Sequence, residues 1–353
     1  MTISKEDIKN ILALAVYAPS GDNSQPWRFA VKGNEIHIFN LPDRDNPYLN
    51  FRQSGSYVAH GGLIENIVIA APHFGYMTNV ILFPDDKILN LVAKVTLEPQ
   101  SPGVDPLYPF IKERCTNRKP YKPKKLTSGQ KNDLIKCPEE VAAGKVILLD
   151  GNEQMKALGK AGSITERIVL ETPFLHKLFF DDLVWTEGEE RQKKRGLYLK
   201  TFELPTPAEV MFRIIKHWQV MNLLNKTGFS RSVAKTNGRL YSSGGALGII
   251  VIPDNSGKGY VNAGRIMQRI WLKATKMGLA LQPVTGVLFI VQRIFANEAK
   301  ELSEGHLQLV KEAYQTIKAS FRVDDGTIAM MFRVGYADSP TARSSRMEPV
   351  VME

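Results

Sequence analysis

The sequence predicts an α+β protein in which two related parts share one chain. Short runs typical of strands occur at 27–41 and 79–97, and again at 246–252, 286–291 and 327–335. A long apolar helix accompanies each set, at 55–76 and at 260–277. A chain of 353 residues is too long for one typical core and suits two. These observations favour mixed or antiparallel sheets around long central helices.

The first part is expected to open with an amphipathic helix over residues 3–17, which Ser4 can cap. The runs 27–32 and 35–41 flank Gly33-Asn34, a two-residue signal for a hairpin. Strands are predicted at 79–83 and 89–97, with the 55–76 helix before them. The stretch 99–106 is rich in proline and resembles a linker, so the boundary between domains is placed between 103 and 104.

The second part mixes helices and strands around one irregular region. A short helix ending near Arg118 is expected first. The elements predicted after it are a helix at 128–135 capped by Thr127, a strand at 145–149, and helices at 152–170 and 302–320. Residues 171–243 combine aromatics, lysines and prolines with a helical stretch at 207–225, which favours a lid or insertion. The tail 336–353 has little hydrophobic pattern.

An internal repeat links the two long helices. Residues 61–75 can be laid on 264–278 with glycines matched at both ends, Ile67 on Ile270 and Ala71 on Ala274. Duplication would build a core like a homodimer interface inside one chain. Two buried helices that each end at a glycine cap would give a similar match, so both explanations stay open.

Composition narrows the classes of function. No apolar run approaches the roughly 20 residues of a membrane span, and the amphipathic N-terminal stretch lacks the apolar core of a signal peptide, so a cytoplasmic location is expected. With two cysteines, and neither an HExxH nor a CxxC motif, no protein-built metal site is expected. The net charge of +10 comes without a nucleic-acid-binding motif, which indicates a solvated basic surface with a local phosphate or substrate pocket.

Two segments have the residue types of an anion or ligand site. The loop 18–29 brings Ser20 and Asn23 beside an aromatic anchor, Trp27, although turn chemistry and a core tryptophan would look the same. The segment 114–118 holds two arginines and a hydroxyl, a set that binds phosphate well but that also occurs in basic surface turns.

Two further segments lie near the end of the chain. The loop that follows Gly278 would bring backbone amides forward through 283–286, or simply connect a helix to a strand. The strand that ends at Tyr336 leads to Arg343 and Arg346, which either reach a ligand or belong to a disordered basic tail. No GxGxxG motif for a resident nicotinamide cofactor occurs.

Together the four segments resemble the flavin-binding motifs of the nitroreductase superfamily. The 18–29 loop is similar to that family's Ala-Pro-Ser-x-x-Asn-x-Gln-Pro-Trp-x-Phe sequence. The resemblance implies one FMN. Four positions would line the flavin pocket: Pro19, Ser20, Gly21 and Asn23. Four would form the phosphate and ribityl arm: Arg114, Cys115, Thr116 and Arg118. Four would lie beside the ring: Pro283, Val284, Thr285 and Gly286. Arg343 or Arg346 would reach the phosphate.

The order of these motifs implies a tandem arrangement with the FMN between the halves, as in the long members that include the Acg-like proteins. The stretch 43–57 loosely resembles the first half of that group, and Arg52 is its one flagged residue. Thr285 stands where the family often has an acid. The implied activity passes hydride from NAD(P)H through FMN to a nitroaromatic, quinone or similar small acceptor.

The alternative function is an FMN-sequestering protein with little turnover. Expected partners are NAD(P)H and a small substrate, with no nucleic acid and no membrane. The oligomeric state is either a monomer with an internal pseudo-dimer or a homodimer. No catalytic side chain is predicted, because the flavin itself performs the transfer.

Overall fold

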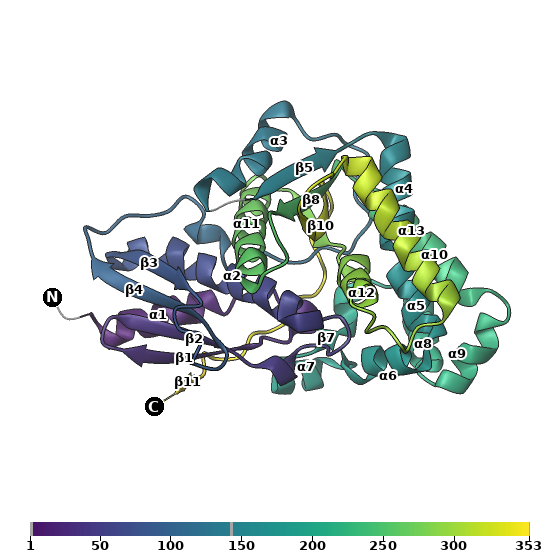
Figure 1. Cartoon of the computed structure of the whole chain (residues 1–353), viewed down its shortest axis with the longest axis horizontal. Coiled ribbons are helices and arrows are strands. Elements are labelled where there is room, and N and C mark those ends of the chain that lie inside the picture. Colours follow the sequence, from purple (N-terminus) through teal and green to yellow (C-terminus); the bar gives the residue numbers. More distant parts are fainter. Residues whose placement is uncertain (1–2, 142–143, 353) are drawn as a thin grey trace.

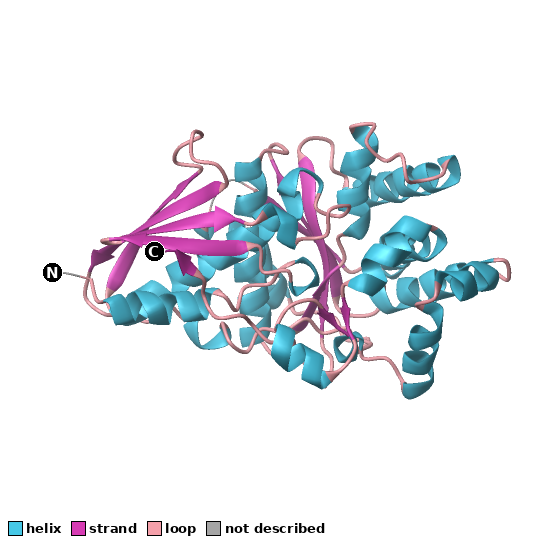
Figure 2. Cartoon of the chain, turned by 90° about the horizontal axis from the view of Figure 1, so that it is seen from below, coloured by secondary structure: helices cyan, strands magenta, loops and turns pink. Residues whose placement is uncertain are grey.

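Two mainly antiparallel sheets lie on either side of a crossed pair of long helices in the computed structural model, which describes residues 3–141 and 144–352 (Figure 1). The helices of the pair are α2 (Ser54–Ala70) and α11 (Gly257–Lys276). A layer of helices covers the far side of the second sheet (Figure 2). The chain is therefore an α+β protein, as its sequence predicts.

The first sheet has the order β11-β1-β2-β4-β3. Its strands are β1 (Trp27–Lys32), β2 (Glu35–Asn40), β3 (Tyr76–Leu82), β4 (Leu91–Pro99) and β11 (Val351–Met352). The predicted hairpin joins β1 to β2, with Gly33 at φ +60° in the two-residue turn. Helix α1 (Lys5–Ala15) begins at the predicted cap, where Asp7 N donates to Ser4 Oγ over 3.3 Å. Its apolar face packs with α2 against the sheet.

The last strand brings the end of the described chain back to the first sheet. β11 pairs in parallel with β1, with Phe29 opposite Val351. Residues 336–350 therefore run from the second sheet to the first (Figure 1).

The second sheet has the order β5-β8-β10-β9 and is antiparallel throughout. Its strands are β5 (Lys145–Leu149), β8 (Ala246–Ile252), β9 (Ala280–Pro283) and β10 (Thr327–Gly335). Helix α11 packs on one face with α3 (Ser128–Ile135), whose predicted cap Thr127 forms a full capping box with Gln130. β8 is buried along its whole length, because helices cover both faces of the sheet.

Helices α2 and α11 cross where each carries a glycine, Gly61 and Gly264. A Cβ on Gly61 would lie 2.0 Å from the Val261 carbonyl oxygen, and one on Gly264 would lie 1.9 Å from that of Val58. Only hydrogen fits at this crossing. These two glycines are also the first matched pair of the sequence repeat, so the repeat aligns the points at which the helices meet.

Buried polar contacts flank the crossing. Glu65 of α2 is fully buried and accepts from Arg265 Nε at 2.8 Å and Arg269 Nε at 2.5 Å. Next to it, Gln268 Nε2 donates to Asn66 Oδ1 over 2.6 Å. These contacts fix how the two helices are aligned.

The helical layer is built from residues 152–241 and 286–321. Its helices are α4 (Asn152–Gly162), α5 (Ile164–Glu171), α6 (Pro173–Asp181), α7 (Glu187–Lys193), α8 (Thr206–Ile215), α9 (Trp218–Asn225), α10 (Phe229–Tyr241), α12 (Gly286–Phe295) and α13 (Glu304–Phe321). A small sheet of β6 (Leu183–Val184) and β7 (Leu197–Tyr198) lies within it. Glu171 ties the layer together, because its carboxylate accepts from Ser230 of α10 at 2.7 Å and faces His306 Nε2 of α13 at 2.9 Å.

Three predicted elements were wrong. The run 286–291 is not a strand but the first part of helix α12, which packs against α13 in the core. The helix predicted at 152–170 is two helices that break at Ser163. The segment that ends at Arg118 is extended, because Thr116 bridges to Leu281 beside β9, and the helix before it is a single short turn over Tyr108–Phe110.

The division into domains at 103 and 104 stays a prediction. Most of residues 171–243 is helical rather than irregular. No helix in the described ranges is long and apolar enough to cross a bilayer.

Candidate functional site

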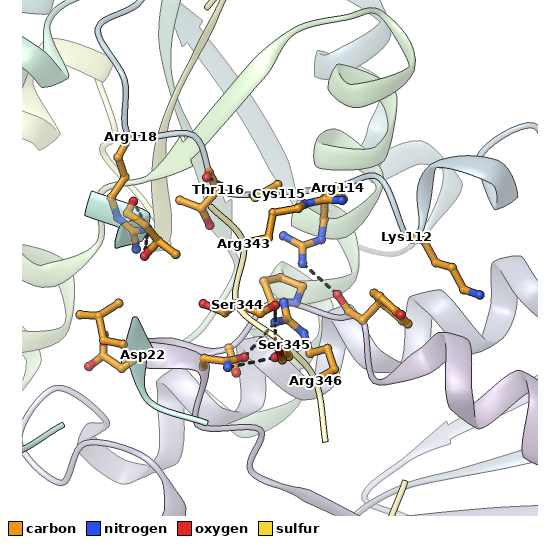
Figure 3. Close-up of a pocket in the computed structure, with 16 residues that line it drawn as sticks. Asp22, Lys112, Arg114, Cys115, Thr116, Arg118, Arg343, Ser344, Ser345 and Arg346 are labelled. Carbon is orange, nitrogen blue, oxygen red and sulfur yellow. Dashed lines mark hydrogen bonds between the residues drawn. The ribbon is translucent and has the colours of Figure 1, made fainter. Parts of the chain in front are cut away.

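A cavity of about 320 Å³ lies where three distant stretches of the chain meet (Figure 3). They are the loop 17–23, the extended segment 112–118 and the tail 343–346. Leu197 and Thr201 close it from the helical layer. The site is therefore assembled by the fold and not by one contiguous motif.

Arg114 is held at the base of the cavity. Its Nη2 donates to the Tyr17 carbonyl over 2.8 Å, and its guanidinium carbon lies 4.5 Å from the centroid of the Trp271 ring. The side chain is only 5% exposed, and Nε has no hydrogen-bond partner among the described residues. The stacking on α11 and the bond to the 17–23 loop fix the guanidinium in place.

The tail adds two further arginines from the opposite side. Arg346 Nη1 donates to Asn23 Oδ1 at 2.9 Å and to the carbonyl of Ser345 at 3.1 Å, whereas its Nε is buried without a partner among the described residues. Arg343 Nη2 donates to the carbonyl of Glu113. We call Arg114, Arg343 and Arg346 the arginine cluster.

Among the described residues, no carboxylate forms an ion pair with this cluster. The salt bridges found among the described residues include none of the arginine cluster. Burial, together with repulsion from Arg346 and Arg343, lowers the pKa of Arg114 to about 9. Burial also lowers the pKa of Arg346 to about 10, with repulsion from Arg343 in the same direction. Three like charges that include a buried guanidinium favour an anion, and a phosphate matches guanidinium donors.

Arg118 lies at the other end of the cavity, beside Asp22. Its Nη1 donates to both the carbonyl and the hydroxyl of Thr201 at 3.2 Å. Burial raises the pKa of Asp22, and the charge of Arg118 opposes that rise. Arg118 therefore joins the extended segment to the helical layer rather than to the arginine cluster.

The loop 18–25 is strained. Asp22, Asn23 and Gln25 have φ of 45°, 57° and 49°, the left-handed region that non-glycine residues rarely adopt. Two hydrogen bonds hold the loop in this conformation: Gln25 N donates to Ser20 Oγ at 3.0 Å, and Met347 N donates to Gln25 Oε1 at 2.9 Å. Strain of this kind is a feature of ligand sites.

Residues 182–203, which we call the clamp, fasten the cavity from the helical layer. The Lys194 carbonyl accepts from Gln25 Nε2 at 2.7 Å and from Asn23 Nδ2 at 3.3 Å. The Glu190 carboxylate accepts from Ser345 N at 2.5 Å and Oγ at 2.6 Å. The clamp therefore holds both the 18–25 loop and the tail.

Nine of the fourteen predicted cofactor residues line this one cavity: Pro19, Ser20, Asn23, Arg114, Cys115, Thr116, Arg118, Arg343 and Arg346. Gly21 does not line the cavity. A Cβ there would lie 3.0 Å from Asp45 Oδ1, so close packing against Asp45 accounts for a glycine at this position.

The predicted ring-edge residues also lie outside the cavity wall. Val284 N donates to the Met331 carbonyl over 2.8 Å, so that amide is already used. Gly286 faces Thr165, whose side chain lies 2.5 Å from the position of an added Cβ. Pro283 and Thr285 complete this turn between β9 and α12. The turn is nevertheless near the cavity, because Thr116 bridges to Leu281 two residues before it.

Sequence reasoning missed seven lining residues: Tyr17, Asp22, Lys112, Leu197, Thr201, Ser344 and Ser345. Asp22 and Ser344–Ser345 are next to predicted site residues in the sequence, so the predicted motifs already pointed to these positions. Leu197 and Thr201 had no such signal in the sequence. They reach the cavity through tertiary contacts with residues far away in the chain, as Thr201 does with Arg118 83 positions before it, and such contacts leave no local pattern. Within the described ranges, no group of His, Cys, Asp or Glu could hold a metal ion.

Comparison with known proteins finds distant relatives in Mycobacterium tuberculosis. An uncharacterized protein of Mycobacterium tuberculosis strain CDC 1551 is 23% identical over 341 residues, which cover 94% of this chain and 46% of that protein. A protein of strain H37Rv, provisionally named an NAD(P)H nitroreductase, is 28% identical over 168 residues, 47% of each chain. The chain thus spans about half the length of the curated relatives it matches.

No family model matches the chain. A solved nitroreductase with bound FMN from Bacteroides fragilis is 8% identical, and the match covers 69% of this chain and 95% of that one, with a TM-score of 0.36. That structural likeness is weak, and no conclusion depends on it. The similarity to the uncharacterized mycobacterial protein covers nearly the whole chain, and the similarity to the protein named a nitroreductase covers about half of it, so the chain is similar in sequence to the nitroreductase-like superfamily.

Proposed function

We propose that the cavity binds FMN and that the protein is an FMN-dependent oxidoreductase. The observation that carries this proposal is the arginine cluster: Arg114 is buried, no member makes an ion pair among the described residues, and Nε of Arg114 and of Arg346 has no partner there. Uncompensated buried charge is unfavourable, so the fold favours an anion here. The phosphate of FMN supplies one, and the family relationship favours FMN over a free phosphate.

The residues present fit this cofactor. The arginine cluster would hold the phosphate, and the Thr116 hydroxyl and the strained 18–25 loop would contact the rest of the molecule. The turn 283–286 would lie near the ring because it continues from β9, beside which Thr116 lies. A bound flavin supplies hydride transfer between NAD(P)H and a small acceptor such as a nitroaromatic or quinone.

The protein's own residues would position and enclose the cofactor. Arg118 and Thr201 draw the extended segment against the clamp, and the Lys194 carbonyl holds Gln25 in place. We further propose that the two parts of the chain form an internal pseudo-dimer with one FMN between them, whether the chain acts as a monomer or as a homodimer. The crossing at Gly61 and Gly264 supports this, since the repeat aligns both contact points.

The clamp favours a second function, FMN sequestration with little turnover. Hydrogen bonds from Asn23, Gln25 and Ser345 all close onto residues 190–194. A site fastened on two sides exchanges ligands slowly, because several hydrogen bonds must break before it opens.

The absorbance spectrum of the FMN-loaded protein before and after anaerobic NADPH or NADH separates the two functions. Bleaching of the flavin band near ~450 nm would support the reductase. A band that persists would support sequestration.

FMN titrations of Arg346→Ala and of the exposed control Arg191→Ala test the binding site itself. Each charge-assisted bond is worth roughly 1.5–3 kcal/mol, so Arg346→Ala is expected to weaken FMN binding at least tenfold while Arg191→Ala leaves it unchanged. Equal affinities would place FMN elsewhere, and no binding by the native chain would refute the proposal.

A further inference from the structure

A second cavity, of about 180 Å³, lies where helices α2 and α11 both begin. Tyr57 of α2 and Tyr260 of α11 line it, each four residues before the first matched glycine of the sequence repeat. Phe51, Phe295 and Tyr314 add aromatic walls, and Leu288 and Ile328 add aliphatic ones. It shares no lining residue with the arginine-lined cavity. We propose that this cavity binds a single-ring aromatic carboxylate.

Its size and walls select one aromatic ring. An apolar protein cavity of roughly 150 Å³ can hold benzene, so about 180 Å³ accepts one ring with a small substituent and excludes a flavin. Tyr57 already meets Phe83 edge to face at 5.4 Å, and Phe295 meets Tyr314 at 5.7 Å. A ligand ring can extend these contacts at the same spacing.

A buried hydroxyl indicates that the ligand carries oxygen. Ser54 is 1% exposed, and its Oγ makes no hydrogen bond within the described part of the chain. Tyr260 is 2% exposed, and its hydroxyl has the Gln292 side chain as a hydrogen-bonding neighbour. A buried polar atom without a partner is costly, and an oxygen acceptor in the cavity would satisfy the Ser54 hydroxyl.

The local charge favours an anion over a neutral oxygen. The positive ends of two helices meet here, since Ser54 and Gly257 are their first residues. Arg52 lies at the rim with its side chain 71% exposed, and its nearest acid is Glu298 at 3.8 Å. Arg52 and Gln53 are both left-handed, with φ of 50° and 64°, so the rim is strained.

Benzoate is the probe. Its fluorinated analogue 4-fluorobenzoate is expected to bind in the same way, so fluorine NMR of that analogue follows binding to the full chain. The double variant Ser54→Ala with Tyr260→Phe keeps the ring walls and removes both hydroxyls, and it is expected to weaken binding at least tenfold. Cyclohexanecarboxylate, which has the charge without the flat ring, and benzyl alcohol, which has the ring without the charge, are each expected to bind at least tenfold more weakly than benzoate.

Arg346→Ala, which alters only the arginine-lined cavity, is expected to leave benzoate binding unchanged, so failure of the FMN assignment would not mimic failure here. Binding that survives in the double variant, or that Arg346→Ala abolishes, would overturn the proposal, as would no binding at all. If the double variant does not fold, Arg52→Gln at the rim replaces it, with a severalfold loss expected and no loss contradicting the carboxylate.

Discussion

The glycine crossing of α2 and α11 makes a quantitative prediction about stability. In Gly61→Ala the new Cβ would lie 2.0 Å from the Val261 carbonyl oxygen, whereas ordinary contact begins at 3.4 Å, so the helices must separate by about 1.4 Å. A gap of even 0.5–1 Å forfeits about a quarter to a half of each dispersion contact along the interface. We therefore expect a loss of at least about 3 kcal/mol in the free energy of unfolding.

Urea unfolding followed by circular dichroism measures this loss. Gly264→Ala, whose Cβ would lie 1.9 Å from the Val58 carbonyl, should cost as much. The double variant should cost less than the two losses added, because one separation relieves both clashes. Gly129→Ala is the matched control, since its nearest atom is 3.9 Å away on an exposed helix and alanine should be neutral or slightly stabilising there. If Gly61→Ala unfolded at the same urea concentration as Gly129→Ala, the crossing described here would be wrong.

Three further predictions concern buried charge. Glu65→Gln should lower the free energy of unfolding by about 3 kcal/mol because it leaves Arg265 without a carboxylate and Arg269 with only its pairs to Glu140 and Asp105. Removing the exposed Arg191–Glu187 pair should change it by less than about 1 kcal/mol, and urea unfolding compares the two. Burial alone would raise the pKa of Glu171, but its hydrogen bonds bring the pKa down to about 2. Up to about 2 kcal/mol of stability should therefore be present above pH 4.5 and lost as pH falls toward 2, and Glu171→Gln should flatten that part of the profile. Arg333, fully buried 3.9 Å from the Tyr121 ring centroid, bonds Gln282 Oε1 and two backbone carbonyls, which lysine cannot match, so Arg333→Lys should lower the melting temperature by several degrees; an unchanged value would contradict this.

Strands with alternating burial could be predicted from the sequence, but one apolar run could not. The hairpin 27–40 alternates in burial and has a two-residue turn, and strands 145–149 and 327–335 are bounded as expected. Residues 287–291 are all apolar, so periodicity cannot distinguish a strand from a buried helix. Tertiary packing against α13 decides for the helix. β11 was missed because two residues at a sheet edge carry almost no pattern.

The site was partly predictable for a related reason. Arg114 and Arg118 lie four residues apart on one segment, so their chemistry is visible in the local sequence. The roles of Lys194, Glu190 and Thr201 were not, since each acts through a contact with a residue more than 80 positions away. A backbone carbonyl such as that of Lys194 has no signature in the sequence at all.

The stacking of Arg114 on Trp271 gives the cavity a built-in optical reporter. A cation 4.5 Å from an indole shifts the energy of its excited state, and an anion that draws on that guanidinium changes the shift. The other tryptophans lie elsewhere: Trp27 in the first sheet, and Trp185 and Trp218 in the helical layer. A variant that retains only Trp271 would therefore report the arrival of inorganic phosphate, a colourless ligand, through its emission alone.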